Sequence, residues 1–242
     1  MTRSTAVEAR GVGVVRGPRR HRRAVLHDIG LDLPVGSITG LFGPSGCGKT
    51  TLMRSLTGLQ RHTGDLPVLG HAAGSAALRG RIGYVTQSPS LYPELTVEQN
   101  LTYFARLAGG TAEGIVEKLG VQEVRHHRVA DLSGGQRGRA SLGAALVGDP
   151  ELLIMDEPTV GLDPVIRTRL WDTFRNLAQQ GRTLLVSSHV MEEAAQCDAL
   201  LLMREGRIIW RGTPSGLLSD TATDSHEEAF LSVITEAREE QR

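Results

Sequence analysis

A strand, a glycine-rich loop and a helix follow one another without a break early in this chain, and this run restricts the fold more than any other feature. The apolar segment SITGLF, residues 37–42, leads directly into GPSGCGKT, residues 43–50. The next residues, TTLMRSLTGL, carry leucines at helical spacing: Leu52, Leu56 and Leu59. The loop matches the pattern G-x-x-x-x-G-K-[ST], which holds phosphate when a strand precedes it and a helix follows. The sequence therefore predicts an α/β core with a phosphate-binding loop.

The residues of this loop fit a nucleotide with a bound magnesium ion. Backbone N–H groups and the start of the helix would enclose the β-phosphate, while Lys49 would reach the β and γ oxygens. The hydroxyl of Thr50 would hold Mg²⁺. The candidate nucleotide-binding residues of this segment are Gly43, Pro44, Ser45, Gly46, Cys47, Gly48, Lys49, Thr50 and Thr51.

The second half of the chain alternates buried strands with helices. Near-continuous apolar runs, typical of parallel strands covered on both faces, occur at 152–156, 183–188 and 199–203. Helices are expected at 164–180 and 190–197, between these strands. The alternation predicts an α/β core with a mostly parallel central sheet.

Two further parts are expected around this core. Alternating segments at 6–15 and 24–33 predict an antiparallel β opening, with a turn of Gly, Pro and basic residues between them. Helical periodicity from Thr96 to Val147, with one apolar face formed by Val97, Leu101, Phe104 and Leu107, predicts an inserted helical subdomain. We expect one domain over 1–242. Its parts are a core with the β subdomain (1–87 and 148–220), the helical subdomain (88–147) and a tail helix (221–242).

Two carboxylates follow the apolar strand at 152–156. Asp156 ends this strand and Glu157 comes directly after it. A carboxylate at the end of a strand beside a phosphate loop can hold the metal, usually through water, and a second one can polarise the attacking water. The alternative, that Asp-Glu-Pro is only a polar exit from a strand, is as good if this segment is taken alone.

Composition narrows the class of protein. The 27 basic and 27 acidic residues give a formal net charge of zero, which argues against a nucleic-acid binder. The only two cysteines, Cys47 and Cys197, are too few for a disulfide framework and indicate a reducing compartment. The sequence has no run of about 18 apolar residues and no signal peptide, so we expect a chain that does not itself span a membrane.

The segment LSGGQ at 132–136 also has the character of an anion-binding helix start. Ser133 would cap the helix, and the glycines at 134 and 135 would let an anion approach the backbone closely. Taken by themselves, these five residues are better explained as a plain Ser-Gly-Gly helix start. No lysine accompanies them, and the loop at 43–50 already provides a complete phosphate site.

Together these segments resemble the nucleotide-binding subunits of ATP-binding cassette (ABC) transporters over nearly the whole chain. The matching elements, in the order of that family, are GPSGCGKT, Gln87 after a strand, LSGGQ, LLIMDEP at 152–158, GLDP at 161–164, and His189 after TLLVSS. The resemblance implies a P-loop NTPase core that binds and hydrolyses ATP with Mg²⁺.

The resemblance also assigns roles to residues that the pattern alone does not explain. LSGGQ would serve the ATP held by a second ABC subunit, either an identical copy or a paralogue, in a head-to-tail dimer. Glu157 would be the general base, and His189 and Lys49 would act on the γ-phosphate. The residues implied to contact magnesium are Thr50, Gln87 and Asp156. The residues implied at the paired sites of the dimer are Ser133, Gly134, Gly135, Gln136 and Asp163.

One position departs from the family. An aromatic residue, often tyrosine, usually stacks on adenine near the end of the first strand, and here Val15 or Arg16 occupies that region. Arg16 can stack through the flat face of its guanidinium group.

The stretch SPSLYPELTVEQNLTYFARLAG after Gln87, together with DEPTVGLDP and the ending GRIIWRGTPSGLL, resembles bacterial exporter ATPases of the multidrug or antibiotic-resistance type. This resemblance implies an integral membrane permease as partner and a peripheral position on the cytoplasmic side of the membrane. Leu91, Tyr92 and Leu95 would lie near the groove that receives the permease, or would simply pack within the helical subdomain. Two alternatives are a soluble ABC-type ATPase that remodels a protein or nucleic-acid complex, and a subunit of an ABC importer.

Overall fold

The phosphate-loop strand lies inside a six-stranded sheet. In the computed structural model, which describes residues 4–18 and 20–239, the strand order is β11–β10–β3–β9–β8–β7. All neighbours are parallel except β10 and β11, which form an antiparallel hairpin. The strands are β3 Ile38–Phe42, β7 Ile82–Val85, β8 Leu152–Asp156, β9 Thr183–Ser188, β10 Ala199–Arg204 and β11 Arg207–Gly212. The mostly parallel central sheet is confirmed.

A second, antiparallel sheet forms the opening of the chain. β1 Thr5–Arg16 pairs with β2 Arg23–Pro34, as the alternating pattern predicts. Three short strands that were not predicted extend this sheet: β4 Thr63–Asp65 and β5 Pro67–Val68 pair with β1, and β6 His71–Ala72 pairs with β5. At two or three residues each, these strands are too short to show an alternating pattern.

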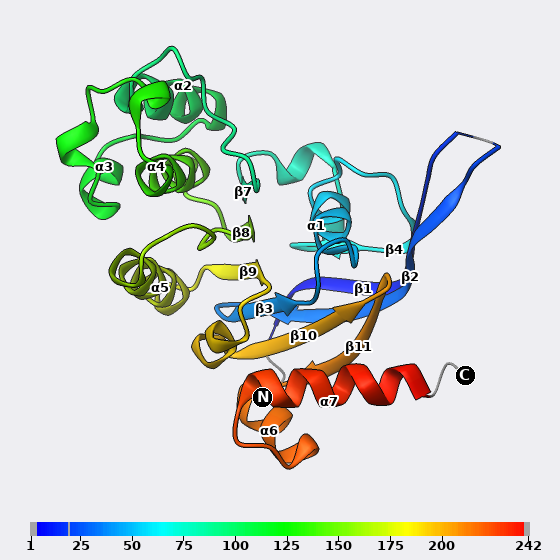
Figure 1. Ribbon diagram of the computed structural model, residues 1–242. Coiled ribbons are helices and arrows are strands. Elements are labelled where there is room, and N and C mark those ends of the chain that lie inside the picture. The colour runs from blue at the N-terminus through cyan, green and yellow to red at the C-terminus, as the bar shows by residue number, and fades with distance from the viewer. Residues whose placement is uncertain (1–3, 19, 240–242) are drawn as a thin grey trace.

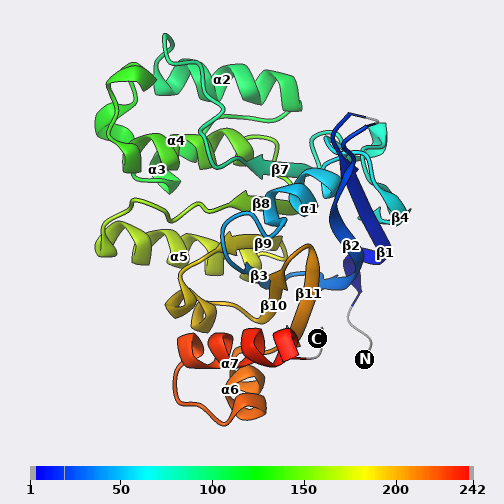
Figure 2. The same ribbon diagram turned by 45° about the vertical axis from the view of Figure 1, so that its right-hand side comes forward.

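Among the described residues, the insertion between β7 and β8 is built from helices, with a single isolated β-bridge between Thr96 and Arg128. The helices are α2 Val97–Ala108, α3 Ile115–Lys118 and α4 Gly134–Leu146, with 3₁₀ turns at Gln122–Val124 and Val129–Asp131. Figures 1 and 2 show them stacked at one end of the molecule, beyond the edge strand β7. We propose residues 88–147 as the helical subdomain on this basis. The expected apolar face is wrong at Leu107, which is 68% exposed although Val97 and Leu101 are buried.

The helix after the phosphate loop is shorter than predicted. α1 spans Lys49–Leu56, and the chain leaves the helix at Thr57 and at Gly58, which has a φ of +78°. Leu59, expected on the buried face of this helix, therefore lies beyond its end and is 72% exposed. The glycine ends the helix because it adopts left-handed φ values at little cost.

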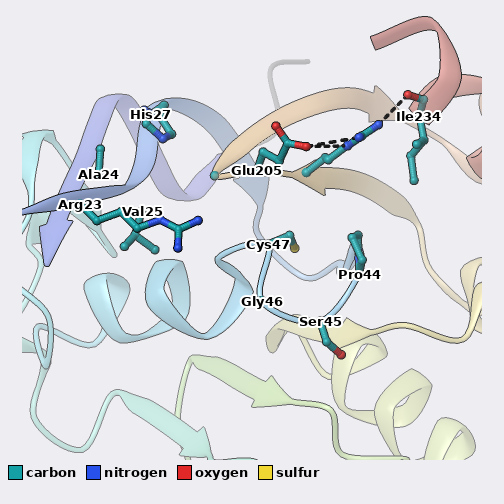
Figure 3. Close-up of a pocket in the computed structure, with 12 residues that line it drawn as sticks. Arg23, Ala24, Val25, His27, Pro44, Ser45, Gly46, Cys47, Glu205 and Ile234 are labelled. Carbon is teal, nitrogen blue, oxygen red and sulfur yellow. Dashed lines mark hydrogen bonds and ion pairs between the residues drawn. The ribbon is translucent and has the colours of Figure 1, made fainter. Parts of the chain in front are cut away.

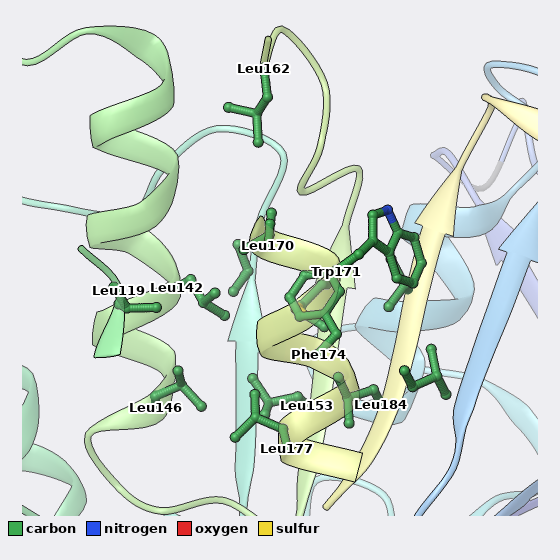
Figure 4. Close-up of a cluster of buried hydrophobic side chains, with 14 of the residues drawn as sticks. Leu119, Leu142, Leu146, Leu153, Leu162, Leu170, Trp171, Phe174, Leu177 and Leu184 are labelled. Atoms are coloured by element: carbon green, nitrogen blue, oxygen red, sulfur yellow. The ribbon is translucent and has the colours of Figure 1, made fainter. Parts of the chain in front are cut away.

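The two faces of the central sheet are covered by different layers. Leu153 and Met155 of β8 face the layer of α4 and α5, whereas Leu152 and Ile154 face α1 and the antiparallel sheet. Helix α5, Pro164–Gln179, packs Phe174 and Trp171 into the layer on the Leu153 side of the sheet (Figure 4). The ring centroids of these two aromatic side chains lie 5.4 Å apart. The sheet is thus rigidly held on both sides, and the ends of its strands can position polar groups.

The remaining helical segments follow β9 and β11. The segment expected as a helix at 190–197 is a 3₁₀ helix, Met191–Gln196. Helices α6 Pro214–Thr221 and α7 His226–Glu239 end the described chain. Of the expected tail helix over 221–242, residues 240–242 lie outside the described residues. None of the helices in the described ranges combines the length and the apolar character that crossing a bilayer requires.

Candidate nucleotide-binding and hydrolysis site

The phosphate loop connects β3 to α1 through positions that require glycine. A Cβ atom on Gly43 would lie 2.1 Å from the carbonyl oxygen of Met203. Gly48, at φ +115°, caps the start of α1, and a Cβ there would lie 2.8 Å from Met203 Cε. Gly46, at φ +79°, faces open space. The loop is therefore held tightly at both ends while its tip is open to a ligand.

Lys49 is the first residue of α1, and its side chain turns back into the loop. The ammonium donates hydrogen bonds to the carbonyl oxygens of Gly43 at 2.6 Å and Pro44 at 3.3 Å. It also lies 3.6 Å from Glu157 Oε1, and the side chain is only 5% exposed. Its positive charge is thus fixed at the mouth of the loop, where a phosphate would be bound.

Glu157 has an unusual backbone conformation. Its φ is +53°, in the left-handed region that residues other than glycine rarely adopt. Its backbone N–H donates to Ser187 Oγ at 2.9 Å, and this hydroxyl donates to Asp156 Oδ1 at 2.8 Å. The pairing of Asp156 with Ser187 across β8 and β9 provides these contacts. Strained residues of this kind occur often at functional sites, because the surrounding structure holds them in place.

Two other predicted residues converge on the Glu157 carboxylate. Gln87 Nε2 donates to Glu157 Oε2 at 3.4 Å, and His189 Nδ1 lies 3.5 Å from the same oxygen. Gln87 follows β7, and His189 follows β9. The structure therefore brings together Lys49, Gln87, Glu157 and His189 from four separate segments, with Asp156 adjacent.

The buried carboxylate of Asp156 fits a magnesium site. Its Oδ1 accepts from Ser187, but its Oδ2, although buried, has no hydrogen-bond partner among the described residues. A buried carboxylate oxygen left without a partner is costly unless a ligand, an ion or water satisfies it. Mg²⁺ binds oxygen ligands and commonly uses one or two carboxylates together with the phosphates of the substrate. Asp156 and the hydroxyl of Thr50, the second residue of α1, are suitable donors.

The Ser133 segment lies apart from this cluster. Ser133 caps α4 through a capping box: its Oγ accepts from Gln136 N at 3.3 Å, and its N–H donates to Gln136 Oε1 at 2.9 Å. Within the described residues, no hydrogen bond or ion pair joins 133–136 to 43–51. Figures 1 and 2 show α4 and α1 on opposite sides of β7 and β8.

The neighbourhood of Ser133 is open to a ligand or a partner. A Cβ on Gly134 would meet no atom within 4 Å, whereas one on Gly135 would lie 3.3 Å from Leu162 Cδ2. Asp163 caps α5, with its Oδ1 accepting from the N–H groups of Val165 and Ile166 at 3.0 Å each. Both segments thus present helix starts whose capping groups are already ordered.

A cavity of about 750 Å³ lies beside the phosphate loop. Figure 3 shows Pro44, Ser45, Gly46 and Cys47 of the loop on one side, with Glu205 of the β10–β11 turn opposite. Arg23, Ala24 and Val25 of β2 also line it, and no Phe, Tyr or Trp of the described ranges does. Arg16 is not part of this lining and donates from Nε to Gln60 Oε1 at 3.0 Å. The adenine contact of Arg16 stays a prediction.

Burial sets the protonation state of the Cys47 thiol within the loop. It raises the pKa of Cys47, while the neighbouring Lys49 charge opposes this effect. The thiol therefore stays protonated near neutral pH, and no disulfide is formed by either cysteine.

The sequence did not point to Ser187, although this residue orders both carboxylates. The available signal was a pair of serines at the end of an otherwise apolar run, TLLVSS. A hydroxyl at the carboxyl end of a buried parallel strand lies where the neighbouring strands also end, so such a residue is a candidate for orienting their side chains.

Comparison with known proteins identifies the family. The family model described as ABC transporter matches residues 26–160. A Nod factor export ATP-binding protein I of Burkholderia orbicola is 38% identical over 207 residues, covering 81% of this chain and 68% of that protein. A linearmycin resistance ATP-binding protein of Bacillus subtilis is 36% identical over 227 residues, covering 89% of this chain and 73% of that protein.

Solved structures agree on the fold. The ATP-binding subunit of an ABC transporter superposes with a TM-score of 0.85 at 23% identity, covering 95% of this chain and all of that one. A dimeric ATP-binding cassette in a post-hydrolysis state, bound to ADP and Pi, superposes with a TM-score of 0.78 at 22% identity, covering 86% and 98%. With this fold and a phosphate loop beside converging acid, base and amide groups, the chain belongs to the ABC transporter family as an ATP-binding, ATP-hydrolysing domain.

Proposed function

We propose that this protein is the motor subunit of a bacterial ABC exporter for drugs, antibiotics or lipid-like compounds. The observation that carries the proposal is the convergence of Lys49, Gln87 and His189 on Glu157 beside the phosphate loop. The similarity to ATP-binding proteins named for Nod factor export and linearmycin resistance supports export rather than import.

The geometry of the site supports a separate role for each of its residues. Glu157 is the general base for the attacking water, and Lys49 with the loop N–H groups binds the β- and γ-phosphates. Thr50, Gln87 and Asp156 are the proposed contacts of Mg²⁺, which would neutralise the charge of the phosphates. His189, half-exposed and 3.5 Å from Glu157, is placed to contact the γ-phosphate.

A second subunit would complete each site. Ser133, Gly134 and Gly135 form an accessible helix start that has no contact with the phosphate loop of its own chain in the described residues. The positive end of the α4 dipole attracts anions. This segment needs no lysine of its own, because Lys49 of the other copy already supplies one to the same nucleotide. We propose that two chains, identical or paralogous, close head to tail around two ATP molecules, with Asp163 near the interface.

Ser133→Arg should retain ATP binding but fail to close the dimer. The bulky cation would occupy the space that the nucleotide needs above α4, while the phosphate loop of each chain stays intact. Closing a dimer from 1% to 99% needs about 5.5 kcal/mol of differential binding, so we expect turnover to fall about 100-fold or more when these contacts are blocked. Gel filtration with Mg-ATP in a Glu157→Gln background measures closure, and a fluorescent ATP analogue measures binding.

Thr213→Arg is the matched control. Thr213 is also an exposed N-cap residue, whose hydroxyl accepts from Gly216 N at 3.0 Å, but it caps α6 away from the loop. Both substitutions remove a cap worth about 1 kcal/mol, so their effects on stability should be similar. If Ser133→Arg dimerises with ATP as readily as Thr213→Arg, the head-to-tail arrangement is wrong.

An exposed aromatic surface on the helical subdomain suits a membrane-protein partner. Tyr92 is 44% exposed and packs edge-on against Tyr103 and face-on against Phe104, at centroid distances of 5.1 and 6.2 Å. Leu107, on the same helix α2 as Phe104, is also exposed and, with Phe104, lines a groove of about 280 Å³ between α2, α4 and β7. Leu91 instead packs partly buried against the core. Exposed apolar groups gathered at a groove mark interaction sites.

We propose this groove, together with the exposed Tyr92 that stacks on Phe104 of its lining, as the docking site of a permease, which would hold the protein peripherally on the cytoplasmic side of the membrane. Affinity purification from native membranes in mild detergent should recover an integral protein with several membrane-spanning helices. Tyr92→Ala combined with Leu107→Ser should lose this protein while retaining ATP binding. Leu231→Ala, at an exposed apolar position on α7, is the control and should retain it.

The same purification separates the alternatives. Recovery of only water-soluble proteins or nucleic acid would favour a remodelling ATPase. Recovery of a permease together with a substrate-binding protein would favour an importer.

A further inference from the structure

Glu193 is a buried acid next to the proposed site, but it has no role in that site so far. Glu193, in the 3₁₀ helix Met191–Gln196, is 3% exposed. Glutamate is almost never fully buried unless it is paired, because desolvating its charge is costly. The contacts of this carboxylate therefore indicate what it does.

One oxygen of Glu193 holds the two segments that carry His189 and Glu157. Glu193 Oε2 accepts from Ser188 Oγ at 2.6 Å and from Thr159 Oγ1 at 3.1 Å, and both hydroxyl residues are buried. Ser188 immediately precedes His189, and Thr159 follows Glu157 by two residues. A single carboxylate oxygen thus ties the backbone of one site residue to that of the other.

The turn at His189 is fixed from both sides by the same network. Ser188 Oγ, while donating to Glu193, accepts from Val190 N–H at 3.0 Å. The Val190 carbonyl in turn accepts from the N–H of Glu193 at 3.2 Å. Because the residues before and after His189 are both held by hydrogen bonds, the backbone position from which its exposed imidazole extends toward Glu157 is fixed.

The other oxygen of Glu193 faces helix α5. Glu193 Oε1 lies 3.7 Å from Arg167 Nε, an ion pair without a hydrogen bond. Arg167 is in the first turn of α5, where its N–H donates to the carbonyl of the capping residue Asp163 at 2.9 Å. The charge of Glu193 is therefore balanced by a residue next to the proposed dimer-facing segment.

We propose that Glu193 is a positioning residue that fixes the position of the His189 side chain relative to Glu157. It does so through Ser188 and Thr159. Through Arg167 it also links both site residues to α5. The inference rests on the proposed roles of His189 and Glu157 in ATP hydrolysis. The 3.5 Å separation between His189 Nδ1 and Glu157 Oε2 is the quantity that this network maintains.

Loss of the network should lower turnover without weakening ATP binding. Ser188→Ala removes one hydroxyl, and Glu193→Ala removes the whole link. A small misplacement of reacting groups is costly, so we expect kcat to fall about 10-fold or more with KM for ATP changed less than about twofold. Glu193→Gln keeps an oxygen that accepts from both hydroxyls and should recover most of the rate. Glu192→Ala, at the exposed neighbouring position, should match the parent protein.

A double-mutant comparison distinguishes positioning from a general loss of structure. In a His189→Ala background, measured by single-turnover hydrolysis, Ser188→Ala should lower the rate further by less than about twofold, because it acts through a side chain that is absent. Parent-like kcat for Ser188→Ala, or an equal loss in both backgrounds, would overturn the inference. If Glu193→Ala fails to fold, as circular dichroism would show, Ser188→Ala decides alone.

The same measurements show separately whether the proposed function fails. Parent-like turnover of His189→Ala would remove the role assigned to His189, and the inference with it. Reduced turnover of His189→Ala combined with an equal loss from Ser188→Ala in both backgrounds overturns the inference and leaves the proposed function standing.

Discussion

Glu157→Gln should bind ATP as the parent protein does and hydrolyse it about 10² to 10⁴ times more slowly, the range typical for loss of a positioned general base. The amide keeps the shape of the side chain and one acceptor oxygen, which can accept from either Gln87 or Lys49, so the site should stay assembled. Because ATP persists, the variant should accumulate as an ATP-bound dimer. Phosphate release measures the rate, and gel filtration with Mg-ATP measures the dimer.

The control for this substitution is Glu192→Gln, which removes the same charge at an exposed position on the helix after β9. It should change turnover less than twofold. Equal turnover of Glu157→Gln and the parent protein would refute the assignment of the general base. Slow turnover without an ATP-bound dimer would instead refute the coupling of nucleotide to closure.

The backbone of Glu157 explains why a substitution here is expected to affect the chemistry more than the fold. A left-handed φ costs a residue other than glycine about 1 kcal/mol or more, and the Ser187 hydroxyl helps to hold it. Glutamine incurs the same backbone cost as glutamate, and Lys49 keeps its hydrogen bonds to the carbonyls of Gly43 and Pro44, so the variant should unfold at nearly the same temperature. The strain is retained because this conformation aims the carboxylate between Lys49 and His189.

The predictable parts of this protein are those specified by contiguous residues. Strand β3, the phosphate loop and α1 are consecutive in the sequence, and each has its own local signal. Apolar runs likewise identified β8, β9 and β10, because parallel strands buried on both faces are apolar throughout. The P-loop fold follows from these elements, whereas the roles of Gln87 and His189 rested on resemblance to a family.

The remaining features depend on which segments are neighbours in space. Ser187 orients Asp156 only because β9 lies beside β8 in parallel register, and no local pattern specifies that order. Glu193 acquires its partners in the same way, from hydroxyls on two different loops. Leu107 has the spacing of a buried residue but lies on the open side of α2, because periodicity does not show how far the covering layer extends.

Lys49→Ala should lose nucleotide affinity and should also disturb the empty site. Charge-assisted hydrogen bonds are each worth about 1.5–3 kcal/mol, so losing the ammonium should weaken ATP binding about 10- to 100-fold. In the empty protein the same change removes the cation 3.6 Å from the largely buried Glu157 carboxylate. An unpaired buried charge is destabilising, so the variant should also unfold at a lower temperature.

These two effects can be separated by combining Lys49→Ala with Glu157→Gln. Because glutamine carries no charge to leave unpaired, Lys49→Ala should lower the unfolding temperature less in the Glu157→Gln background than in the parent. The loss of ATP affinity should be the same in both backgrounds, since it arises from the phosphate contacts alone. Lys118→Ala, which removes the only other lysine at an exposed position, should change neither quantity. A loss of affinity that disappears in the Glu157→Gln background would mean that Lys49 acts on ATP only by holding Glu157 in place.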